Sequence, residues 1–336
     1  VTRDNKWGIQ SPFPGSEDKT IYVWVEAVLG YVSATIQYFQ RLGKEEQWKE
    51  YWFNKQAKTL YFIGKDNIPF HTVILPALLL ATHEDYNLPW TVHSTEFLMF
   101  DGQAFSKSKR IGIWVDEALE LFPADYWRYS LLAIRPEVKD TNFSWTTLLE
   151  KVNSDLNDTL GNFIHRTLTF INKQFNSTIP TPCSLDETDA ATLKEAKEII
   201  CKTQENMEQF KLQEALRTAI SLSHLGNRYF NEKEPWKTLK TQPQTAANTL
   251  YVAAQIVKQL AVILEPFIPF TSENLWQLLN LEGSVHEQRW TETEKELPPN
   301  HVIGKAKPLF TKIEGNEETL QAQLEQARAR LHKSKG

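Results

Sequence analysis

The chain has 336 residues, of which 41% are hydrophobic and 24% charged, and its formal net charge is -5. This length predicts two domains, each large enough to bury its own core, and the composition excludes an intrinsically disordered chain. The net negative charge argues against binding nucleic acid over the whole surface and leaves only a local basic path open.

Neither a membrane span nor a disulfide or zinc site is expected. The longest apolar stretch, Phe70 to Ala81, is about a dozen residues long and contains Pro76, whereas a span needs roughly 20. The two cysteines, Cys183 and Cys201, lie far apart without a close histidine, so neither pairing nor zinc binding is supported. We therefore expect a cytoplasmic protein. The first residues lack a methionine and a signal or transit peptide, and they resemble the middle of a longer sequence.

Short apolar runs and helical stretches alternate over the first 100 residues. The expected order is a strand over 20–27, a helix over 29–42, a strand over 59–66, a helix over 67–83 and a strand over 91–100. This order predicts a parallel sheet with right-handed crossovers, whose ligands bind beyond the carboxyl ends of the strands.

From about Val152 onward the apolar residues follow a helical period instead. One stripe comprises Val152, Leu156, Leu160, Ile164, Leu168 and Ile171. Similar stripes recur between Pro, Gly, Ser and Thr breaks, and they predict a bundle of four or five helices. The last segment, 316–336, is polar with a thin leucine stripe, and it is either a frayed helix or a linker.

Several motifs allow two interpretations from the residues alone. The stretch AFSKSKR, residues 104–110, is either a basic surface loop or a loop that handles phosphates. Asp66 in GKDNIPFH either caps the next helix or binds a ligand at the end of a strand. The neighbouring aromatic residues either pack in the hydrophobic core or line a binding pocket. Asn162 and Arg166 lie four residues apart and therefore project from one helix face.

Three segments in fixed order decide between these interpretations: VWVEAVLGYVSAT, YFIGKDNIPFHTVILPALL and MFDGQAFSKSKRIGIW. Together they resemble the second half of the catalytic domain of class I aminoacyl-tRNA synthetases, in the methionyl-tRNA synthetase family. The family's KMSKS loop reads AFSKS here. NDTLGNFIHR and NRYFNEKEPW extend the resemblance to about residue 315, and the archaeal and eukaryotic branch is the most similar.

The resemblance implies a two-part architecture. Residues 1–147 are expected to form the second half of a Rossmann-type parallel-sheet catalytic domain, 148–315 an α-helical anticodon-binding bundle, and 316–336 a polar tail. The family's HIGH motif, first strands and zinc-bearing connective domain are not matched. SHLGN, 223–227, looks like HIGH but follows the loop within a helical stripe, so we expect His224 to be a surface or packing residue.

The implied activity is the ATP-dependent attachment of methionine to tRNA(Met), with Mg²⁺ accompanying ATP. Lys107 is the implied catalytic cation, because a mobile lysine that meets the departing pyrophosphate stabilises the transition state. Ala104 replaces the family's first lysine, and Lys109 and Arg110 are the cations that could compensate. The implied ATP-binding residues are Gly64, Asp66, Ser106, Lys107 and Ser108.

Two further groups of residues follow from the resemblance. The implied methionine pocket contains Trp24, Ala27, Tyr31, Asn67, Phe70 and His71. The implied anticodon-binding residues are Asn162, Arg166 and Trp236, whose side chains suit stacking on bases and bonding to base edges.

Other functions stay open. One is a noncatalytic tRNA-binding product of a split gene or a truncated paralogue, which the missing HIGH segment and Ala104 favour. Another is a sister synthetase for leucine, isoleucine or valine. The expected partners are tRNA(Met), methionine and ATP, together with either the missing amino-terminal half or an appended tRNA-binding domain. Without the HIGH-containing half, the chain alone is expected to be inactive.

Overall fold

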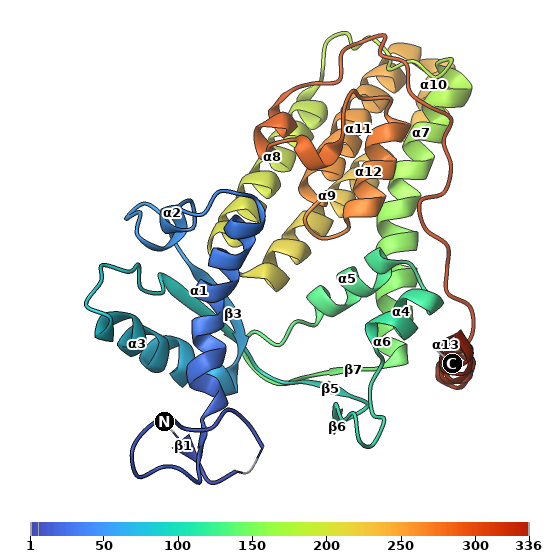
Figure 1. Ribbon diagram of the computed structural model, residues 1–336. Coiled ribbons are helices and arrows are strands. Elements are labelled where there is room, and N and C mark those ends of the chain that lie inside the picture. The colour runs from blue at the N-terminus through green and yellow to red at the C-terminus, as the bar shows by residue number, and fades with distance from the viewer. Residues whose placement is uncertain (1, 6, 335–336) are drawn as a thin grey trace. The chain divides into compact units, whose positions relative to one another are not determined.

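The computed structural model describes residues 2–5 and 7–334, which are drawn in Figure 1. The chain forms two compact units, each of which is described by itself. Unit 1 comprises Val1–Phe97 and Pro136–Asp140, and unit 2 comprises Leu98–Arg135 and Thr141–Gly336. The predicted functional boundaries, after residues 147 and 315, are not decided by this division and stay predictions.

Unit 1 contains a parallel pair of strands covered by helices. Its elements are β1 (Thr2–Arg3), β2 (Thr20–Ile21), α1 (Val23–Arg41), α2 (Lys49–Trp52), β3 (Leu60–Gly64), a 3-10 turn (Lys65–Asn67), a π-helix (Phe70–Ile74), α3 (Leu75–Ala81) and β4 (Thr91–Thr95). Strands β3 and β4 pair in parallel, from Leu60 opposite Thr91 to Gly64 opposite Thr95. The predicted parallel pairing is therefore confirmed for these strands.

The strand predicted over 20–27 is wrong. Only Thr20 and Ile21 belong to a strand, and helix α1 begins at Val23. The run of β-branched and aromatic residues has strand composition, but it also continues a helical stripe that buries Val28 and Val32. A short apolar run does not separate the two possibilities, and the burial of this stripe decides for the helix.

The strand predicted over 91–100 is interrupted. Residues 91–95 form β4, whereas β5 (Leu98–Phe100) belongs to a different sheet in unit 2. Backbone bonds hold the break open, since the Glu96 N–H donates to the Pro136 carbonyl and the Phe97 N–H to the Asp140 carboxylate. These bonds use backbone groups that a continuous strand would offer to its neighbour.

Helix α3 shows why Pro76 is tolerated inside the long apolar segment. The preceding turns form a π-helix, and Pro76 lies within the first two residues of α3, where a missing N–H costs little. Leu75 and Leu79 point into the core of unit 1, beside Tyr61 of β3. The predicted helix over 67–83 is thus confirmed as a π-helix followed by an α-helix.

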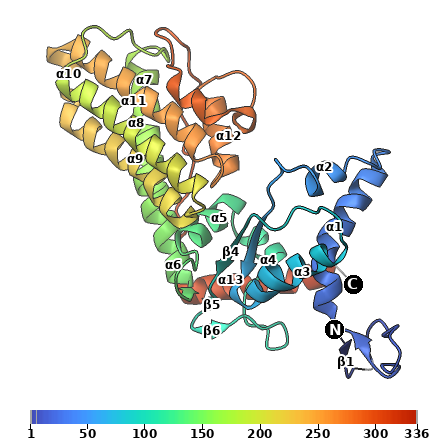
Figure 2. The ribbon, with the colours of Figure 1, turned by 90° about the vertical axis from the view of Figure 1, so that its left-hand side faces the viewer.

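Unit 2 combines a small sheet with a helix bundle (Figures 1 and 2). Its elements are β5, β6 (Gln103–Ala104), α4 (Val115–Leu121), α5 (Ala124–Ala133), β7 (Thr141–Phe143), α6 (Trp145–Glu150), a π-helix (Lys151–Gly161), α7 (Asn162–Gln174), α8 (Glu187–Glu208), α9 (Leu212–Lys233), α10 (Pro235–Thr241), α11 (Pro243–Ile263), α12 (Pro269–Leu278), two 3-10 turns (Val285–Glu287 and Trp290–Glu294) and α13 (Glu317–Ser334). Strand β5 pairs antiparallel with β6 and parallel with β7. The predicted helix bundle is confirmed.

The apolar stripe from Val152 to Ile171 is buried along its whole length. Its members recur mostly every four residues, a spacing that drifts around an α-helix of 3.6 residues per turn. The first part is wound as a π-helix, whose wider turns keep the four-residue spacing aimed at the core.

Helix α11 lies inside the bundle and contacts α7, α8, α9, α10 and α12. By length and composition alone it could cross a membrane, but 94% of its most apolar window is buried inside the protein. An all-round apolar helix of this kind is also what the centre of a large bundle requires.

The last segment is a helix packed on unit 2, and the linker alternative is wrong. Leu320, Leu324 and Ala327 of α13 are buried at spacings of four and three. The thin leucine stripe seen in the sequence is therefore a packing surface.

We expect Gly226→Ala to destabilise the bundle. A Cβ atom at Gly226 of α9 would lie 2.3 Å from the ring of buried Phe163, so the ring must move in a filled core. The expected loss of unfolding free energy is about 1 to 3 kcal/mol, measured by urea unfolding followed by circular dichroism. Gly30→Ala in α1 is the matched control, because its Cβ meets nothing within 4 Å. Equal unfolding midpoints for the two variants would contradict the packing argument.

Candidate functional site

One face of helix α1 carries three of the predicted site residues. Trp24, Ala27 and Tyr31 lie three and four positions apart, so the helix places them on the same side. The Trp24 ring stacks on Phe70, with ring centroids 4.4 Å apart and planes 15° apart. The correction of the predicted strand to a helix is what brings these residues together.

His71 connects α1 to the π-helix. Its Nδ1 lies 2.9 Å from the Asn67 carbonyl oxygen, and its Nε2 lies 2.9 Å from the Tyr31 hydroxyl. A carbonyl only accepts hydrogen bonds, so Nδ1 carries the proton, and in the neutral ring Nε2 accepts from the Tyr31 O–H. The imidazole is only 2% exposed. Its orientation is therefore fixed from both ends.

Tyr61 belongs to this group, and the sequence analysis missed it. Its ring centroid lies 5.1 Å from that of Tyr31 and 5.2 Å from that of His71. Burial raises the pKa of the Tyr61 hydroxyl, so the phenol stays neutral. No local signal marks it, because its ring contacts are with Tyr31 of α1 and His71 of the π-helix. We call Trp24, Tyr31, Tyr61, Phe70 and His71 the aromatic cluster.

Gly64 and Asp66 follow at the carboxyl end of β3. A Cβ atom at Gly64 would meet nothing within 4 Å, so the strand end opens onto free space in the described structure. Asp66 is exposed, and none of the three helical segments from Lys65 to Ala81 has a side-chain cap. The helix-cap interpretation of Asp66 is therefore not supported, and its carboxylate faces solvent.

Lys65 anchors this turn, a role that the sequence did not suggest. Its Nζ lies 2.6 Å from Glu96 and 3.0 Å from Asp140, and 4.3 Å from the centre of the Phe97 ring. The Phe97 N–H and the ammonium group hold the pKa of Asp140 below its usual value. The two carboxylates thus tie the turn after β3 to the segments that lead out of unit 1.

The basic loop 104–110 lies in unit 2 and is closed by its own backbone. Ser106 and Ile111 exchange N–H to carbonyl bonds of 3.0 and 2.9 Å, and the Arg110 N–H donates to the Lys107 carbonyl. Arg110 has a φ of 55°, which completes the tight turn. Lys107 and Lys109 are exposed. The Ser106 hydroxyl lies 3.3 Å from that of Ser108 and accepts from the Lys109 N–H, so it helps to shape the turn.

The three residues predicted to bind the anticodon differ in their surroundings: Arg166 contacts Trp236, whereas Asn162 is exposed. Arg166 of α7 lies 5.5 Å above the Trp236 ring and 4.9 Å above the Phe230 ring. Its guanidinium also donates two bonds, of 3.1 and 3.2 Å, to the side-chain Oδ1 of Asn231. Asn162 is exposed at the start of α7, one turn before Arg166.

The chain reverses sharply between α9 and α10, and this turn presents Trp236. Glu234 has a φ of 41°, in the left-handed region, and Pro235 begins α10. Trp236 is 40% exposed, and its ring centroid lies 6.1 Å from that of Phe230. We call Arg166, Phe230, Asn231 and Trp236 the stacking group. Phe230 and Asn231 were missed, although both lie in the NRYFNEKEPW segment.

His224 is exposed in the middle of α9, as predicted for a surface residue. Cys183 and Cys201 are free and exposed. Among the described residues, no three His, Cys, Asp or Glu side chains gather to hold a metal ion. The expected absence of zinc stays a prediction.

Two family models match this chain. Residues 1–168 match the family described as tRNA synthetases class I (M), and residues 179–329 match the anticodon binding domain of methionyl tRNA ligase. The chain belongs to the class I (M) tRNA synthetases. The predicted family and fold class, a class I catalytic fragment followed by a helical anticodon-binding domain, are confirmed.

Curated relatives extend the likeness over nearly the whole chain. A methionine--tRNA ligase of Thermofilum pendens is 50% identical over 97% of this chain and 57% of its own length. That of Metallosphaera sedula is 45% identical over 99% of this chain and 58% of its own length. The chain thus spans somewhat more than half the length of these relatives.

Solved structures of this class I family share the architecture. A Mycobacterium tuberculosis methionyl-tRNA synthetase in complex with methionyl-adenylate is 26% identical, with a TM-score of 0.78, over 92% of this chain and 59% of its own. The apo form of a methionyl-tRNA synthetase from the same organism has a TM-score of 0.77 at 24% identity, which shows the fold alone.

We expect neutral His71 to carry its proton on Nδ1, because Nδ1 faces a carbonyl and Nε2 faces a hydroxyl. Long-range ¹⁵N–¹H spectra of the imidazole rings report the tautomer directly. Tyr31→Phe should shift the Nε2 resonance by removing its donor and leave exposed His224 unchanged. An Nε2-protonated ring in the unmodified chain would contradict the assigned bonds.

Proposed function

We propose that this chain contributes the aromatic cluster, as part of the methionine pocket, the KMSKS-type loop and the anticodon-binding bundle of a methionine--tRNA ligase. The observation that carries the proposal is the aromatic cluster beside the strand end that holds Gly64 and Asp66. The arrangement joins a hydrophobic, polarizable surface to an exposed carboxylate within one unit.

The aromatic cluster suits the methionine side chain. Methionine is flexible and its sulfur makes favourable contacts with aromatic edges, which Trp24, Phe70 and Tyr61 supply. Apolar contacts alone distinguish single methylene groups by only about 1 to 3 kcal/mol. The hydroxyl of Tyr31 and the imidazole of His71 are the polar groups that add discrimination, and their mutual bond fixes both. Ala27, exposed on the same helix face, leaves room for the substrate.

The proposed reaction has two steps. In the first, a carboxylate oxygen of methionine attacks the α-phosphorus of ATP, supplied with Mg²⁺; a new P–O bond forms and pyrophosphate leaves. In the second, a hydroxyl at the tRNA 3′ end attacks the acyl carbon and AMP leaves. Asp66 accepts hydrogen bonds from the ribose hydroxyls, and Gly64 allows the ribose to approach the strand end.

Lys107 is proposed to stabilise the charge that develops on the departing pyrophosphate. Its ammonium is exposed at the tip of a closed turn, and Ser106 and Ser108 contribute hydroxyls from the same turn. A cation that meets the phosphates mainly in the transition state raises the rate more than it raises substrate affinity. Ala104 supplies no second cation at the start of the loop, and Lys109 and Arg110 are the nearest replacements in sequence.

The stacking group is proposed to receive anticodon bases. Trp236 exposes an aromatic face, and Arg166 offers a planar guanidinium held in place by Asn231. Single-stranded bases stack on such faces, and exposed Asn162 can bond to a base edge from the same side of α7. A cytoplasmic location is part of the same proposal, and the two exposed free thiols are compatible with a reducing compartment.

A noncatalytic tRNA-binding protein is the second candidate. Ala104 favours it, because the loop then lacks one of the family's two lysines. The two functions predict different outcomes for the activation reaction and the same outcome for tRNA binding, so the experiments below separate them.

We expect Trp236→Ala to weaken tRNA(Met) binding about tenfold, because one base loses its stacking partner, an interaction worth about 1 to 3 kcal/mol. Filter binding or fluorescence anisotropy with an anticodon stem-loop measures the affinity. Phe270→Ala is the matched control, since Phe270 is an exposed aromatic residue of the same bundle, 63% exposed on α12. Equal affinities for the two variants would remove Trp236 from the binding surface.

We expect Lys107→Ala to lower the rate of methionine activation by about a hundredfold, because one preorganised donor to the developing charge is lost. ATP–pyrophosphate exchange in the full gene product measures it, and the KM for methionine should stay the same. Lys109→Ala is the control, with a smaller effect. Full tRNA binding without any exchange in the unmodified protein would favour the noncatalytic function.

A further inference from the structure

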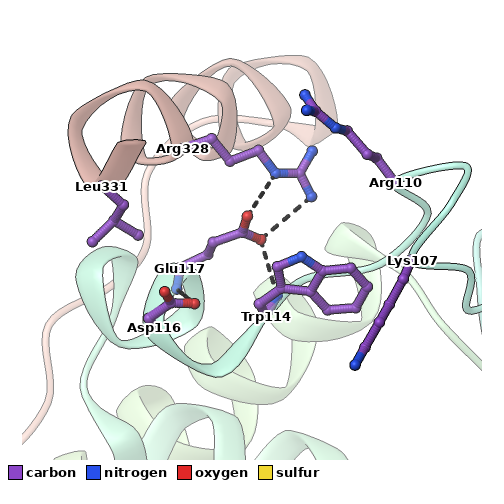
Figure 3. Close-up of a pocket in the computed structure, with 7 residues that line it drawn as sticks. All are labelled: Lys107, Arg110, Trp114, Asp116, Glu117, Arg328 and Leu331. Atoms are coloured by element: carbon purple, nitrogen blue, oxygen red, sulfur yellow. Dashed lines mark hydrogen bonds and ion pairs between the residues drawn. The ribbon is translucent and has the colours of Figure 1, made fainter. Parts of the chain in front are cut away.

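The carboxyl end of the basic loop is held by a residue from the other end of the sequence. Arg328 of α13 donates from Nη2 to the Gly112 carbonyl at 2.6 Å. The same guanidinium pairs with Glu117 of α4, from Nε to Oε1 at 2.9 Å and from Nη2 to Oε2 at 3.3 Å. Arg328 and Glu117 line one pocket of about 470 Å³, which Figure 3 shows together with Lys107, Arg110 and Trp114.

Glu117 links Arg328 to the backbone at Trp114. Its Oε2 also accepts from the Trp114 N–H at 2.9 Å, which fixes the backbone just before α4. Arg328 and Glu117 are mostly buried, with side chains 15% and 8% exposed. Both charges are already largely out of water, so separating them would leave each buried without its partner and its hydrogen bonds, and the pair therefore holds its geometry.

Gly112 lies directly after the bridge that closes the loop. Its φ is 127°, and a Cβ atom there would lie 2.4 Å from the Phe105 ring. The loop therefore returns to the body of unit 2 at one tightly packed residue. The other end of the loop is held separately by strand β6 and by the bond from the Gly102 N–H to the Asn142 carboxamide.

We propose that Arg328 is a positioning residue for the loop 104–110. It binds the Gly112 carbonyl and the Glu117 carboxylate at once, and thereby fixes the carboxyl end of the loop that presents Lys107. Arg110 and Lys107 then extend in different directions from this fixed base, as Figure 3 shows. The inference rests on the proposed function only where it concerns catalysis; the ordering of the loop is independent of it.

Helix α13 also offers a matched control residue. Arg330 lies two positions after Arg328 and pairs with Glu120 of α4 at 3.1 Å. Both partners are about half exposed, and the hydrogen bond that Arg330 donates goes to Glu120 of α4, outside the loop. Arg330→Gln thus removes an ion pair between the same two helices without removing a bond to the loop.

Amide hydrogen exchange on the 336-residue chain tests the ordering. In Arg328→Gln we expect the amides of 104–114 to exchange at least about tenfold faster, because a buried charge loses its partner. In Arg330→Gln the change should stay within about twofold, as for an exposed pair. Arg328→Lys should fall between them, since a lysine is a point charge that cannot reach both acceptors as a fork. Equal effects of Arg328→Gln and Arg330→Gln would overturn the proposal.

Exchange in α9 and α11 serves as the folding check. If Arg328→Gln also loses protection there, the comparison of Arg328→Lys with Arg330→Lys decides instead. Faster loop exchange in the first and not in the second supports the role of Arg328, and equal exchange in both contradicts it.

The catalytic consequence is measured in the full gene product by ATP–pyrophosphate exchange. We expect Arg328→Gln to lower kcat by about tenfold with the KM for methionine unchanged, because a mispositioned cation affects the transition state, whereas the aromatic cluster proposed to bind methionine lies in unit 1. A loosened loop with unchanged kcat would overturn the positioning role. If even the unmodified protein shows no exchange, the proposed function fails, while the amide-exchange comparison still decides whether Arg328 orders the loop.

Discussion

The arrangement of unit 2 depends on the burial of helix α11. Almost every side chain from Ala246 to Ile263 is buried, including Lys258. Each large apolar side chain taken out of water contributes about 1.5 to 3 kcal/mol, so leaving any face of this helix exposed would be costly. Lys258 is accommodated because its ammonium binds Glu292 and the Glu292 and Lys295 carbonyls. The surrounding helices therefore have little freedom in where they pack.

This constraint also explains the stacking group. Helices α7 and α9 both contact α11. Arg166 and Phe230 meet because the two helices share one core, and the turn at Glu234 adds Trp236 to them. The stacking group is therefore held by contacts within the bundle itself.

The sequence predicted the parts of the molecule that depend on local periodicity. The stripe from Val152 to Ile171, the strand β3 and the helix that contains His71 all follow from spacing and composition. The strand expected over 20–27 failed because its composition favours a strand while the burial of Val28 and Val32 demands a helix. Nothing local in 91–100 signals the break after Thr95, which depends on bonds to Pro136 and Asp140. Tyr61, Lys65 and Asn231 were missed because their roles come from contacts between distant segments.

The contact between Arg328 and Gly112 joins residues 216 positions apart in the sequence. During synthesis the loop and helix α4 leave the ribosome long before α13 is made. Until then the Gly112 carbonyl lacks the Arg328 guanidinium, Glu117 has its local bond from the Trp114 N–H but not its ion pair, and the loop lacks its last restraint. A nascent chain that stops short of residue 328 can therefore close the loop through its own Ser106–Ile111 backbone bonds, but Gly112 is not yet tied to α13.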